Sequence, residues 1–538
     1  MANIQELGYP SIPTYLSDVL TNISPPKPVT PQYLAQLGVE LLEAKQESVE
    51  LENSNVQSRL RRRIPTKIDF DEAAITLMTL FTFKNIRVSE RSTDYLLGVY
   101  VDHGPKEGIY ITSRKELYRL IDPLVPYYRN KDIDDVLDKI ERMVPTVVQT
   151  SEPSLFIVNN GIYNQDSDVL MPFSPEYTYL VKIPINYKDS PKSPVLIDQN
   201  DNSSWDVESW LFSLAGDEDT ATLIWEVIAD TLQPSRSRGR SIWFYSESGN
   251  NGKGTIGQLI KNLLGIGNYS SLSVTEFKHE FMKETLIGVA ANISDENDVD
   301  VYIDSVRDYK ASVTGDDINI NRKYEKPVRL QFKGTNIQMM NGLPKTKDKS
   351  DSFYRRLILV PFLQSFTNNG EKKYIKDIYI ARQDVLEFVL WKALHMKFNE
   401  FTIPAKSETL LYDYKEMNNP VMQFWNELHE EFQWDLLPTQ FLYDLFVQWS
   451  HRNNPIGKPM GKSSFTTTLN NLLKDDPNWV VKTGQNDKVK SGNKLDADEP
   501  LITEYNLTAW KDKSYMGTNL RRSRQFTKAA TYRGYLRK

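Results

Sequence analysis

One stretch, SIWFYSESGNNGKGTIGQLIKNLLG, constrains the fold more than any other part of the chain. Its first five residues, 241–245, are an apolar, aromatic-rich run that predicts a buried strand. Its last third carries apolar residues at helical spacing on one face, namely Ile256, Leu259, Ile260, Leu263 and Leu264. Gly265 is a natural helix end. The stretch therefore predicts a strand, a glycine loop and a helix, the arrangement that a phosphate-binding loop requires.

The loop departs at two positions from the pattern G-x-x-x-x-G-K-[ST] of such loops. Glu247 stands at the first glycine position and Gly254 at the Ser/Thr position, so a hydroxyl appears only at Thr255. Small residues let successive backbone N–H groups turn toward phosphate oxygens, and Lys253 can reach the β- and γ-phosphates. We expect bound ATP, with Thr255 as a candidate magnesium ligand; the alternative is an ordinary Gly/Asn turn. The expected binding residues are Gly249, Asn250, Asn251, Gly252, Lys253, Gly254 and Thr255.

Acidic and amide side chains follow two later apolar runs. The run 286–293 is followed by Asp295, 42 residues after Lys253, and by Glu296. Asp295 is expected to hold Mg²⁺ through water and Glu296 to polarise the attacking water. The run 337–340 ends at Asn341, whose amide is expected to orient water or contact the γ-phosphate. An exposed acidic loop is the alternative for the first pair.

Two arginines, Arg355 and Arg356, precede a further predicted strand, LILVPF. An arginine at such a place can reach the nucleotide of a neighbouring subunit and neutralise transition-state charge. The alternative is a pair of solvated surface arginines.

Taken together, these pieces resemble a known family. GNNGKGT, ISDEND, TGDDINI-NRKYEKP, MMNGLP and KSDSFYRRLILVPF occur in the order of the superfamily 3 helicase motor of phage and plasmid primase-helicases, an AAA+ ATPase. The resemblance covers roughly residues 150–480, and its nearest subfamily is the self-loading replication initiator helicases of staphylococcal genomic islands and cassette chromosomes. It implies these roles: Walker A lysine for Lys253, Walker B for Asp295 and Glu296, sensor 1 for Asn341, and arginine finger for Arg356, or alternatively Arg355.

The resemblance also implies a hairpin over residues 316–332 that projects into a ring channel and grips DNA. Arg322, Lys323 and Lys326 are expected near its tip, where contact with phosphates is electrostatic and independent of sequence. The alternative is a solvated hairpin with ordinary surface lysines. The departures at Glu247 and Gly254 are expected to slow hydrolysis.

We expect a multidomain α/β protein. The domains expected are an N-terminal α/β or α+β collar or adaptor over 1–200, an AAA+ motor over 205–375, a helical lid over 376–430, and a winged-helix-like domain with a basic tail over 431–538. Two helices broken near Gly216 are expected to precede the motor strand.

A primase domain, which many relatives of this motor carry, needs a carboxylate pair on a strand and a nearby histidine. Asp69 and Asp71 with His103 are the only candidates. However, DFDEAAITLMTLF is typical of a helix start with Asp as the N-cap. A collar is therefore expected rather than a polymerase.

The C-terminal region carries two amphipathic helical patterns, 441–449 and 465–473, the second with Ser463 or Ser464 as N-cap. A strand, a basic turn with Lys488 and Lys490, and another strand follow, which favours a winged helix over a small packing domain. The tail from Tyr505 to Lys538 holds nine Lys/Arg against one acid, with six aromatic residues. Its expected DNA contacts are Arg521, Arg522 and Arg524.

Composition excludes several other classes. The chain has no cysteine, which removes disulfides, thiolate chemistry and zinc fingers, and its five histidines are scattered. The net charge of −6 means that nucleic acid must meet local basic patches. No apolar run approaches the ~18 residues of a membrane span, so a soluble, cytoplasmic protein without a membrane partner is expected.

The function expected is that of an ATP- and Mg²⁺-dependent DNA helicase and replication initiator of a mobile genetic element or phage. It is expected to act as a homo-hexameric ring on single- and double-stranded DNA, with a single-stranded-DNA-binding protein or host replication proteins as further partners. The resemblance implies 3′ to 5′ translocation. The alternatives are a primase-helicase and an origin-binding initiator that uses ATP as an assembly switch with little hydrolysis.

Overall fold

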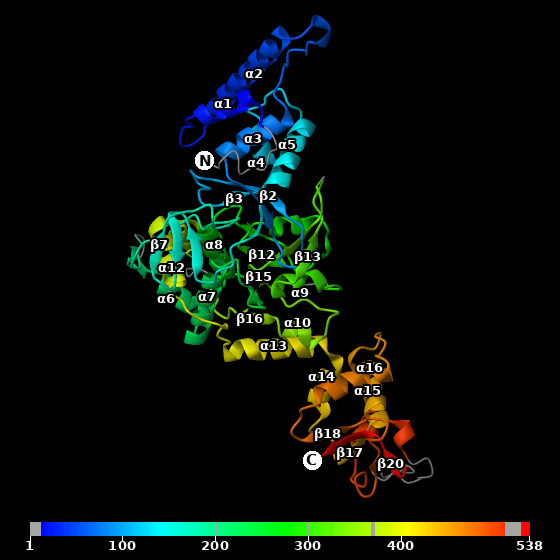
Figure 1. The fold of residues 1–538 in the computed structure, drawn as a ribbon. Coiled ribbons are helices and arrows are strands. Elements are labelled where there is room, and N and C mark those ends of the chain that lie inside the picture. The colour runs from blue at the N-terminus through cyan, green and yellow to red at the C-terminus, as the bar shows by residue number, and fades with distance from the viewer. Residues whose placement is uncertain (1–11, 199–201, 298–301, 324, 367–371, 512–528) are drawn as a thin grey trace. The chain divides into compact units, whose positions relative to one another are not determined.

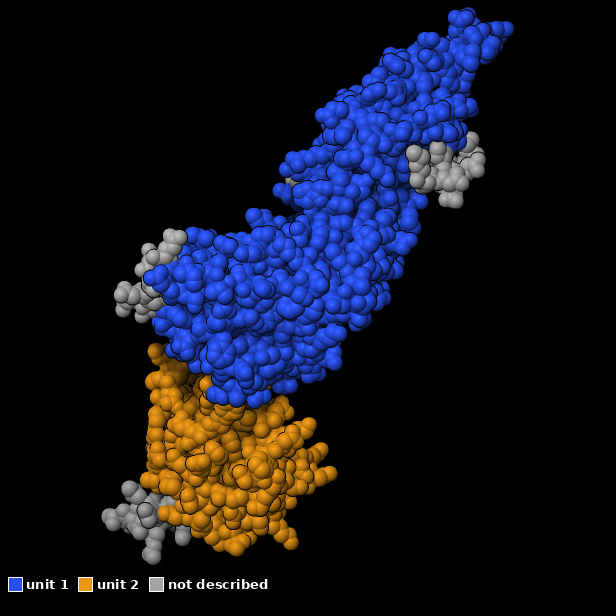
Figure 2. All heavy atoms as spheres, turned by 90° about the vertical axis from the view of Figure 1, so that its left-hand side faces the viewer, with its two compact units in different colours: residues 1–411 blue, residues 412–538 orange. Residues whose placement is uncertain are grey.

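The computed structural model describes residues 12–198, 202–297, 302–323, 325–366, 372–511 and 529–538. The chain divides into two compact units, residues 1–411 and residues 412–538, coloured separately in Figure 2. Within the described ranges, no helix combines the length and apolarity that crossing a bilayer requires. A mixed α/β architecture of several parts, as expected from the sequence, is confirmed.

The first part of unit 1 packs helices on a small mixed sheet (Figure 1). Its sheet has the order β3-β2-β1-β4, in which only the β1–β4 pairing is parallel. One apolar core joins the helices to the sheet. The elements are α1 (Thr14–Asn22), α2 (Pro31–Ser54), η2 (Ser58–Leu60), α3 (Phe70–Leu80), β1 (Phe83–Arg87), β2 (Leu96–Tyr100), β3 (Tyr110–Ile111), α4 (Arg114–Ile121), α5 (Asn130–Met143) and β4 (Thr146–Val148).

The rest of unit 1 is built around a five-stranded parallel sheet of order β11-β12-β15-β10-β16. The elements are β5 (Leu155–Val158), β6 (Gly161–Asn164), β7 (Val169–Met171), β8 (Leu196–Ile197), β9 (Ser204–Trp205), α6 (Val207–Ala215), α7 (Glu218–Thr231), β10 (Ser241–Tyr245), α8 (Lys253–Leu264), β11 (Tyr269–Ser270), η3 (Glu276–Lys278), η4 (Met282–Leu286), β12 (Ala291–Asn297), α9 (Arg307–Thr314), β13 (Asp317–Ile320), β14 (Val328–Gln331), β15 (Thr335–Met340), α10 (Asp351–Tyr354), β16 (Leu357–Pro361), α11 (Lys373–Asp377), η6 (Tyr379–Ala381), α12 (Gln383–Leu394) and α13 (Ala405–Asn418), the last of which runs into unit 2.

The division into units differs from the four expected domains, and the buried cores give the reason. One apolar core contains residues of β5 and β6, of α6 and α7, of the parallel sheet and of α12. A boundary near 200 would cut through this core, since Phe156 and Tyr163 belong to it. The boundary between compact units falls instead between residues 411 and 412.

The strand, loop and helix predicted around Lys253 are present as β10 and α8. The five apolar residues of α8 named above are fully buried, and Gly265 ends the helix with φ 82°. A Cβ at Gly257 would lie 1.8 Å from Cε of Met339, so the glycine lets α8 approach β15 closely. The helix break at Gly216 is likewise confirmed, since α6 ends there with φ 77°.

Unit 2 packs helices on an antiparallel sheet of order β17-β21-β18. Its core contains many aromatic side chains, including Trp434 and Phe424. The elements are α14 (Pro420–Leu428), β17 (Leu436–Pro438), α15 (Thr439–Asn453), α16 (Lys462–Leu472), β18 (Trp479–Lys482), β19 (Val489–Lys490), α17 (Leu501–Glu504), η7 (Thr508–Trp510), β20 (Thr531–Tyr532) and β21 (Gly534–Arg537).

One local expectation for unit 2 is wrong. The N-cap of α16 is Gly461, so Ser463 and Ser464 lie inside the first helical turn instead of capping it. The two strands expected on either side of the turn are present as β18 and β19, and β19 pairs with β20 near the C-terminus. Both α15 and α16 are present close to their expected ranges, and the winged-helix identity of the unit stays a prediction.

A buried ion pair joins the parallel sheet to its flanking helices. Nε of Arg238 lies 2.7 Å from Oδ1 of Asp230, and both side chains are 7% exposed. The other Asp230 oxygen accepts a hydrogen bond of 2.7 Å from Thr335 at the start of β15. The Arg238 guanidinium also lies 3.9 Å from the ring centroid of Phe398. This cluster ties α7, β15 and the segment after α12 together.

We predict that Arg238→Met lowers the free energy of unfolding of unit 1 by about 3–5 kcal/mol, because it leaves the Asp230 carboxylate buried without its cation. Urea unfolding followed by amide hydrogen exchange in β10 and β15 measures the change. The double variant Arg238→Met/Asp230→Asn is the control and should recover part of the loss. A loss below about 1 kcal/mol for Arg238→Met would contradict the prediction.

Candidate functional site

The glycine loop lines a cleft of about 680 Å³ at the carboxyl ends of β10, β12 and β15. Tyr245, the last residue of β10, pairs with Met340, the last residue of β15. The backbone N–H of Ser246 donates to the carbonyl of Met340 over 3.2 Å. The loop and Asn341 therefore leave the sheet side by side at its carboxyl edge. Open parallel sheets bind ligands at this edge. The cleft brings together seven residues expected to bind nucleotide, and with them Asp295 and Asn341.

Two residues of the loop have left-handed backbone conformations, Asn250 with φ 55° and Gly252 with φ 85°. The Asn251 side chain is buried and donates to Oγ of Ser246 and to the carbonyl of Ser248. Asn251 thus holds the shape of the loop, and its side chain faces the loop's own backbone. The N–H of Phe366 donates to the carbonyl of Asn250 over 2.8 Å and anchors the loop from the far side.

Lys253 begins α8 and is 5% exposed. Its Nζ donates to Oδ1 of Asn341 over 3.1 Å. Among the described residues, no carboxylate forms an ion pair with it. Burial lowers the pKa of Lys253 from 10.5 to about 8. A buried ammonium whose hydrogen-bond partner is a neutral amide favours the binding of an anion.

Asp295 lies near the carboxyl end of β12, where the pairing with β15 shifts register. Its carboxylate accepts a hydrogen bond from Nζ of Lys261 on α8. Lys261 was not singled out from the sequence. The available signal is its spacing, because Lys253, Gly257 and Lys261 follow one another at intervals of four on one face of α8. The side chain of Glu296 lies outside the described residues.

Sequence reasoning also missed the basic helix α11. Lys372, Lys373 and Lys376 line the cleft opposite the loop. Lys372 donates to Ser203 over 2.6 Å, and Tyr374 donates to Asp198, so this segment is fixed to the strand pair β8–β9. No periodic pattern marks these lysines in the sequence.

Arg355 and Arg356 do not join this cleft. Ser241, the first residue of β10, pairs with Leu357, and its N–H donates to the carbonyl of Arg356 over 2.7 Å. Both arginines therefore lie at the amino edge of the parallel sheet, opposite the edge that holds Lys253. Arg356 donates through Nη1 to the Ser352 carbonyl, and its buried Nε has no hydrogen-bond partner among the described residues. Arg355 is exposed.

The predicted hairpin is present as β13 and β14, paired from Asp317–Gln331 to Ile320–Val328. Arg322 is 13% exposed at the side chain and is paired with Glu325 and, over 3.7 Å, with Glu284. Lys323 and Lys326 are exposed.

The base of the hairpin is bonded to the first part of unit 1. The N–H of Gln331 donates to the carbonyl of Val88 over 2.9 Å, and Ser89 donates to Asp317 over 2.6 Å. Lys333 pairs with Glu90 over 2.7 Å. The segment between β1 and β2 therefore moves together with the hairpin unless these hydrogen bonds and the ion pair break.

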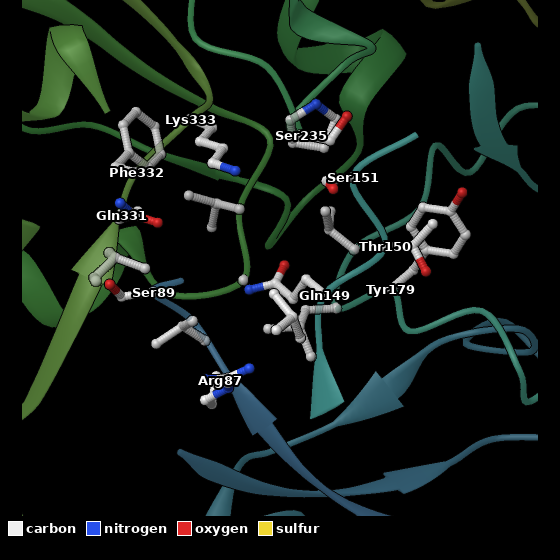
Figure 3. Close-up of a pocket in the computed structure, with 18 of the residues that line it drawn as sticks. Arg87, Ser89, Gln149, Thr150, Ser151, Tyr179, Ser235, Gln331, Phe332 and Lys333 are labelled. Carbon is white, nitrogen blue, oxygen red and sulfur yellow. The ribbon is translucent and has the colours of Figure 1, made fainter. Parts of the chain in front are cut away.

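Figure 3 shows a second, smaller cavity, of about 80 Å³, beside this junction. Arg87, Gln149 and Gln331 reach it from three different segments of unit 1. A volume of this size holds a few waters and no nucleotide. It is a small cavity of mixed polar and apolar lining at the junction between the hairpin and the first part of unit 1.

The remaining expected site residues lie apart from the cleft. Lys488 and Lys490 are exposed in unit 2, while Arg521, Arg522 and Arg524 lie outside the described residues. Their expected contact with DNA stays a prediction.

The candidate primase residues are each engaged elsewhere. The N–H of Asp69 donates to Glu72 over 2.7 Å at the start of α3, and Lys45 pairs with both carboxylates. Asp71 pairs with Lys139, and His103 pairs with its neighbour Asp102. Within the described ranges, no group of three or more His, Cys, Asp or Glu side chains is placed to hold a metal ion.

Three segments of the chain match known families. Residues 85–231 match the family described as D5 N terminal like, residues 416–506 the family Poxvirus D5 protein-like, and residues 244–356 a family of unknown function, DUF5906. The chain is thus similar to D5-type proteins in two separate segments, each of which spans less than a third of its length. The narrower resemblance to staphylococcal island helicases stays a prediction.

One curated relative is the putative helicase L207/L206 of Acanthamoeba polyphaga mimivirus, 22% identical over 220 residues. The match covers 39% of this chain and 22% of that protein, so the chain spans about a fifth of the relative's length. Two solved structures of the NrS-1 C-terminal region are similar at TM-scores of 0.40 and 0.41, with 14% and 15% identity. They cover 73% and 77% of this chain and 84% and 97% of theirs.

The lowered pKa of Lys253 predicts a pH-dependent stability. Below about pH 8 the lysine is charged in both the folded and the unfolded chain, so folding carries the full cost of burying the charge. Above 10.5 it is neutral in both, and that cost vanishes. Lys253→Met should therefore be more stable, relative to wild type, below pH 8 than above 10.5.

Urea unfolding of unit 1 between pH 7 and pH 10.5 measures this difference. Lys131→Met, which removes an exposed lysine of α5, is the matched control and should give a difference independent of pH. A pH-independent difference for Lys253→Met as well would contradict the burial of its charge.

Proposed function

We propose that the chain is an ATP- and Mg²⁺-dependent DNA helicase of the replication-initiator type. One observation carries the proposal: Nζ of Lys253 lies 3.1 Å from Oδ1 of Asn341, in the same cleft at the carboxyl edge of the parallel sheet that Asp295 lines. The D5-like matches and the helicase name of the mimivirus relative support it. The source is proposed to be a phage or another mobile genetic element.

The loop amides and Lys253 bind the triphosphate of ATP in this proposal. Lys253 rests against Asn341 and turns to the phosphate oxygens, which compensate its buried charge better than an amide does. Asn341 is then free to orient a water at the γ-phosphate, and Glu296 is the residue expected to polarise that water.

Two oxygen ligands in the cleft fit Mg²⁺, namely the Asp295 carboxylate and the Thr255 hydroxyl. Magnesium in phosphate sites usually keeps several waters and takes one or two carboxylates plus substrate phosphates, so this set is sufficient. When bound, the ion neutralises charge on the phosphates. To bind Mg²⁺, the Asp295 carboxylate must release the hydrogen bond that it accepts from Lys261.

The position of Arg356 favours a ring. It lies at the opposite edge of the sheet from Lys253, so it reaches a nucleotide only if that nucleotide belongs to another protomer. Cyclic homo-oligomers place unlike faces of one chain against each other in this way. We propose a homo-hexamer in which Arg356, or alternatively Arg355, completes the neighbour's site.

The hairpin β13–β14 is proposed to draw single-stranded DNA through the ring, with the 3′ to 5′ direction that the family resemblance implies. Unit 2 and its basic tail are proposed to bind duplex DNA at an origin. A single-stranded-DNA-binding protein or host replication proteins are proposed as further partners.

Two other functions are less favoured. An initiator that uses ATP only as a switch would bind ATP at the same cleft without turning it over. A primase-helicase needs Asp69 and Asp71 for metal binding, yet each is held by a lysine. Templated primer synthesis that is lost in Asp69→Ala/Asp71→Ala would restore this alternative.

We predict that Lys253→Ala and Arg356→Ala each lose ATP turnover by about 10²-fold or more, because each removes charge stabilisation of the phosphoryl group. Mixing the two variants should restore activity, because one interface combines Lys253 of one protomer with Arg356 of the next. Random mixing leaves about a quarter of interfaces intact. Steady-state phosphate release measures all three samples.

Strand displacement on forked DNA, with and without ATP, and the native mass of the assembly complete the test. Turnover that is absent from wild type, while ATP still binds, would favour the assembly switch. Two inactive variants that stay inactive when mixed would rule out a shared site.

For the hairpin, we predict that Lys326→Ala weakens binding of single-stranded DNA equally for all sequences and lowers the salt dependence. The expected change in the slope of log K against log salt is about 0.7 for each protomer whose lysine contacts a phosphate. Arg322→Ala is the matched variant and should change the slope less, because Glu284 and Glu325 already pair with that guanidinium.

Fluorescence anisotropy of a labelled oligonucleotide at several salt concentrations measures both variants. Equal slopes for wild type and Lys326→Ala would mean that the hairpin tip does not contact phosphates.

A further inference from the structure

The cleft around the loop carries more positive charge than a phosphate-binding loop supplies by itself. Its charged lining residues are Lys253, Lys372, Lys373, Lys376, Asp295 and Asp377. Asp295, the carboxylate that lines the cleft on the strand side among the described residues, accepts a hydrogen bond from Lys261. Lys373 and Lys376 are exposed and form no ion pair within the described residues. Lys372 is held by Ser203 and Asp198, so Lys373 and Lys376 are the α11 lysines on this side of the cleft without an ion pair among the described residues.

Lys376 has a specific position on this side of the cleft. A Cβ built on Gly254 would lie 3.9 Å from Nζ of Lys376, the one heavy atom of the described residues within 4 Å once the adjacent residues and the backbone of α8 are set aside. Residue 254 is the position at which other phosphate-binding loops carry the hydroxyl that binds Mg²⁺. The ammonium of Lys376 therefore lies 3.9 Å from the carbon that would carry that missing hydroxyl.

The surrounding contacts fix α11 in this place. Asn262 of α8 donates to the carbonyl of Ile380, just beyond α11, over 3.2 Å. Tyr374 is bonded to Asp198 on the other side. The helix is consequently attached both to the helix that begins with Lys253 and to the segment before α6, so its lysines face the loop without a rearrangement of the fold.

We propose that Lys376 contacts the phosphate chain directly and takes over part of the role of the hydroxyl absent at Gly254, which makes nucleotide binding less dependent on Mg²⁺. This inference rests on the proposed ATP site. An ammonium and a hydroxyl-bound Mg²⁺ both place positive charge against phosphate oxygens, but only the ammonium does so without a metal ion.

Binding of a fluorescent ATP analogue to the full chain, in EDTA and in Mg²⁺, tests the proposal. Wild type should lose less than about tenfold in affinity when Mg²⁺ is removed. In EDTA, Lys376→Ala should bind about tenfold or more weakly than wild type, and in Mg²⁺ the difference between the two should be smaller. Lys376→Arg keeps the charge and should behave like wild type. Lys131→Ala, at an exposed lysine of α5, is the control and should change neither value.

Gly254→Ser provides the converse test, because the Cβ position has only an ordinary contact with Lys376. The double variant Gly254→Ser/Lys376→Ala should recover affinity in Mg²⁺ but not in EDTA. Circular dichroism and the melting temperature confirm that each variant is folded.

The outcomes separate this inference from the proposed function. If Lys253→Ala abolishes binding while Lys376→Ala binds like wild type in EDTA, the site is real and the role of Lys376 is wrong. An equal loss of affinity for the ATP analogue in EDTA and in Mg²⁺ for Lys376→Ala would also contradict the proposal that Lys376 replaces the missing hydroxyl. If neither lysine affects binding, the proposed nucleotide site itself is wrong.

Discussion

The buried ammonium of Lys253 is the interaction on which the rest of the site depends. A lysine that is only 5% exposed usually has a carboxylate partner, and here its neighbour is the neutral oxygen of Asn341. Such an arrangement is stable only because the parallel sheet and α8 hold both residues in place. A buried ammonium without a carboxylate partner among the described residues favours an anion, in keeping with the proposed phosphate site.

The register of the parallel sheet explains why residues far apart in sequence converge on this lysine. The end of β10 is level with the end of β15, and β12 lies on the other side of β15. The glycine loop follows β10, Asn341 follows β15 and Asp295 lies near the end of β12, all at one edge of the sheet. Arg356 immediately precedes β16 and therefore lies at the opposite edge, which separates the two halves of the proposed site by the height of the sheet.

The sequence was sufficient to predict the features that depend on local pattern alone. The strand, loop and helix around Lys253 carry their own periodicity, and the convergence of Asp295 and Asn341 is a consequence of the rule that parallel strands end at one edge. The roles of Lys261 and Lys376 depend on tertiary packing; the i, i+4 spacing on α8 places Lys261 on the face of Lys253, whereas no local pattern marks Lys376. Lys376 lies 123 residues beyond Lys253, and only the packing of α11 on α8 brings it to the loop.

Tertiary pairing also limits the prediction for the hairpin. A basic tip can be read from the residues at 322–326, but the pairing of Arg322 with Glu284 joins positions 38 residues apart. At Asp69 the local pattern predicted the helix start correctly. It did not predict the ion-pair partner Lys45, which comes from another helix. Local capping was predictable because all its atoms lie within one turn.

The route from the nucleotide site to the hairpin is short and stiff. Strand β14 of the hairpin is followed after three residues by β15, which ends beside Asn341. A Cβ at Gly334, within that connection, would lie 2.4 Å from the carbonyl of Ala290, so the link is packed against the start of β12. Because β15 is buried between β12 and β10, it cannot slide alone without breaking both ladders.

If nucleotide binding moves the hairpin, the whole parallel sheet must therefore move with it as one rigid body. The bonds from Val88, Ser89 and Glu90 to the hairpin base then carry the first part of unit 1 along with it. If the chain forms the proposed ring, the hairpin and the first part of unit 1 bonded to it would shift together as each site fills. Under that proposal, force is transmitted through rigid bodies, and the flexibility lies between protomers.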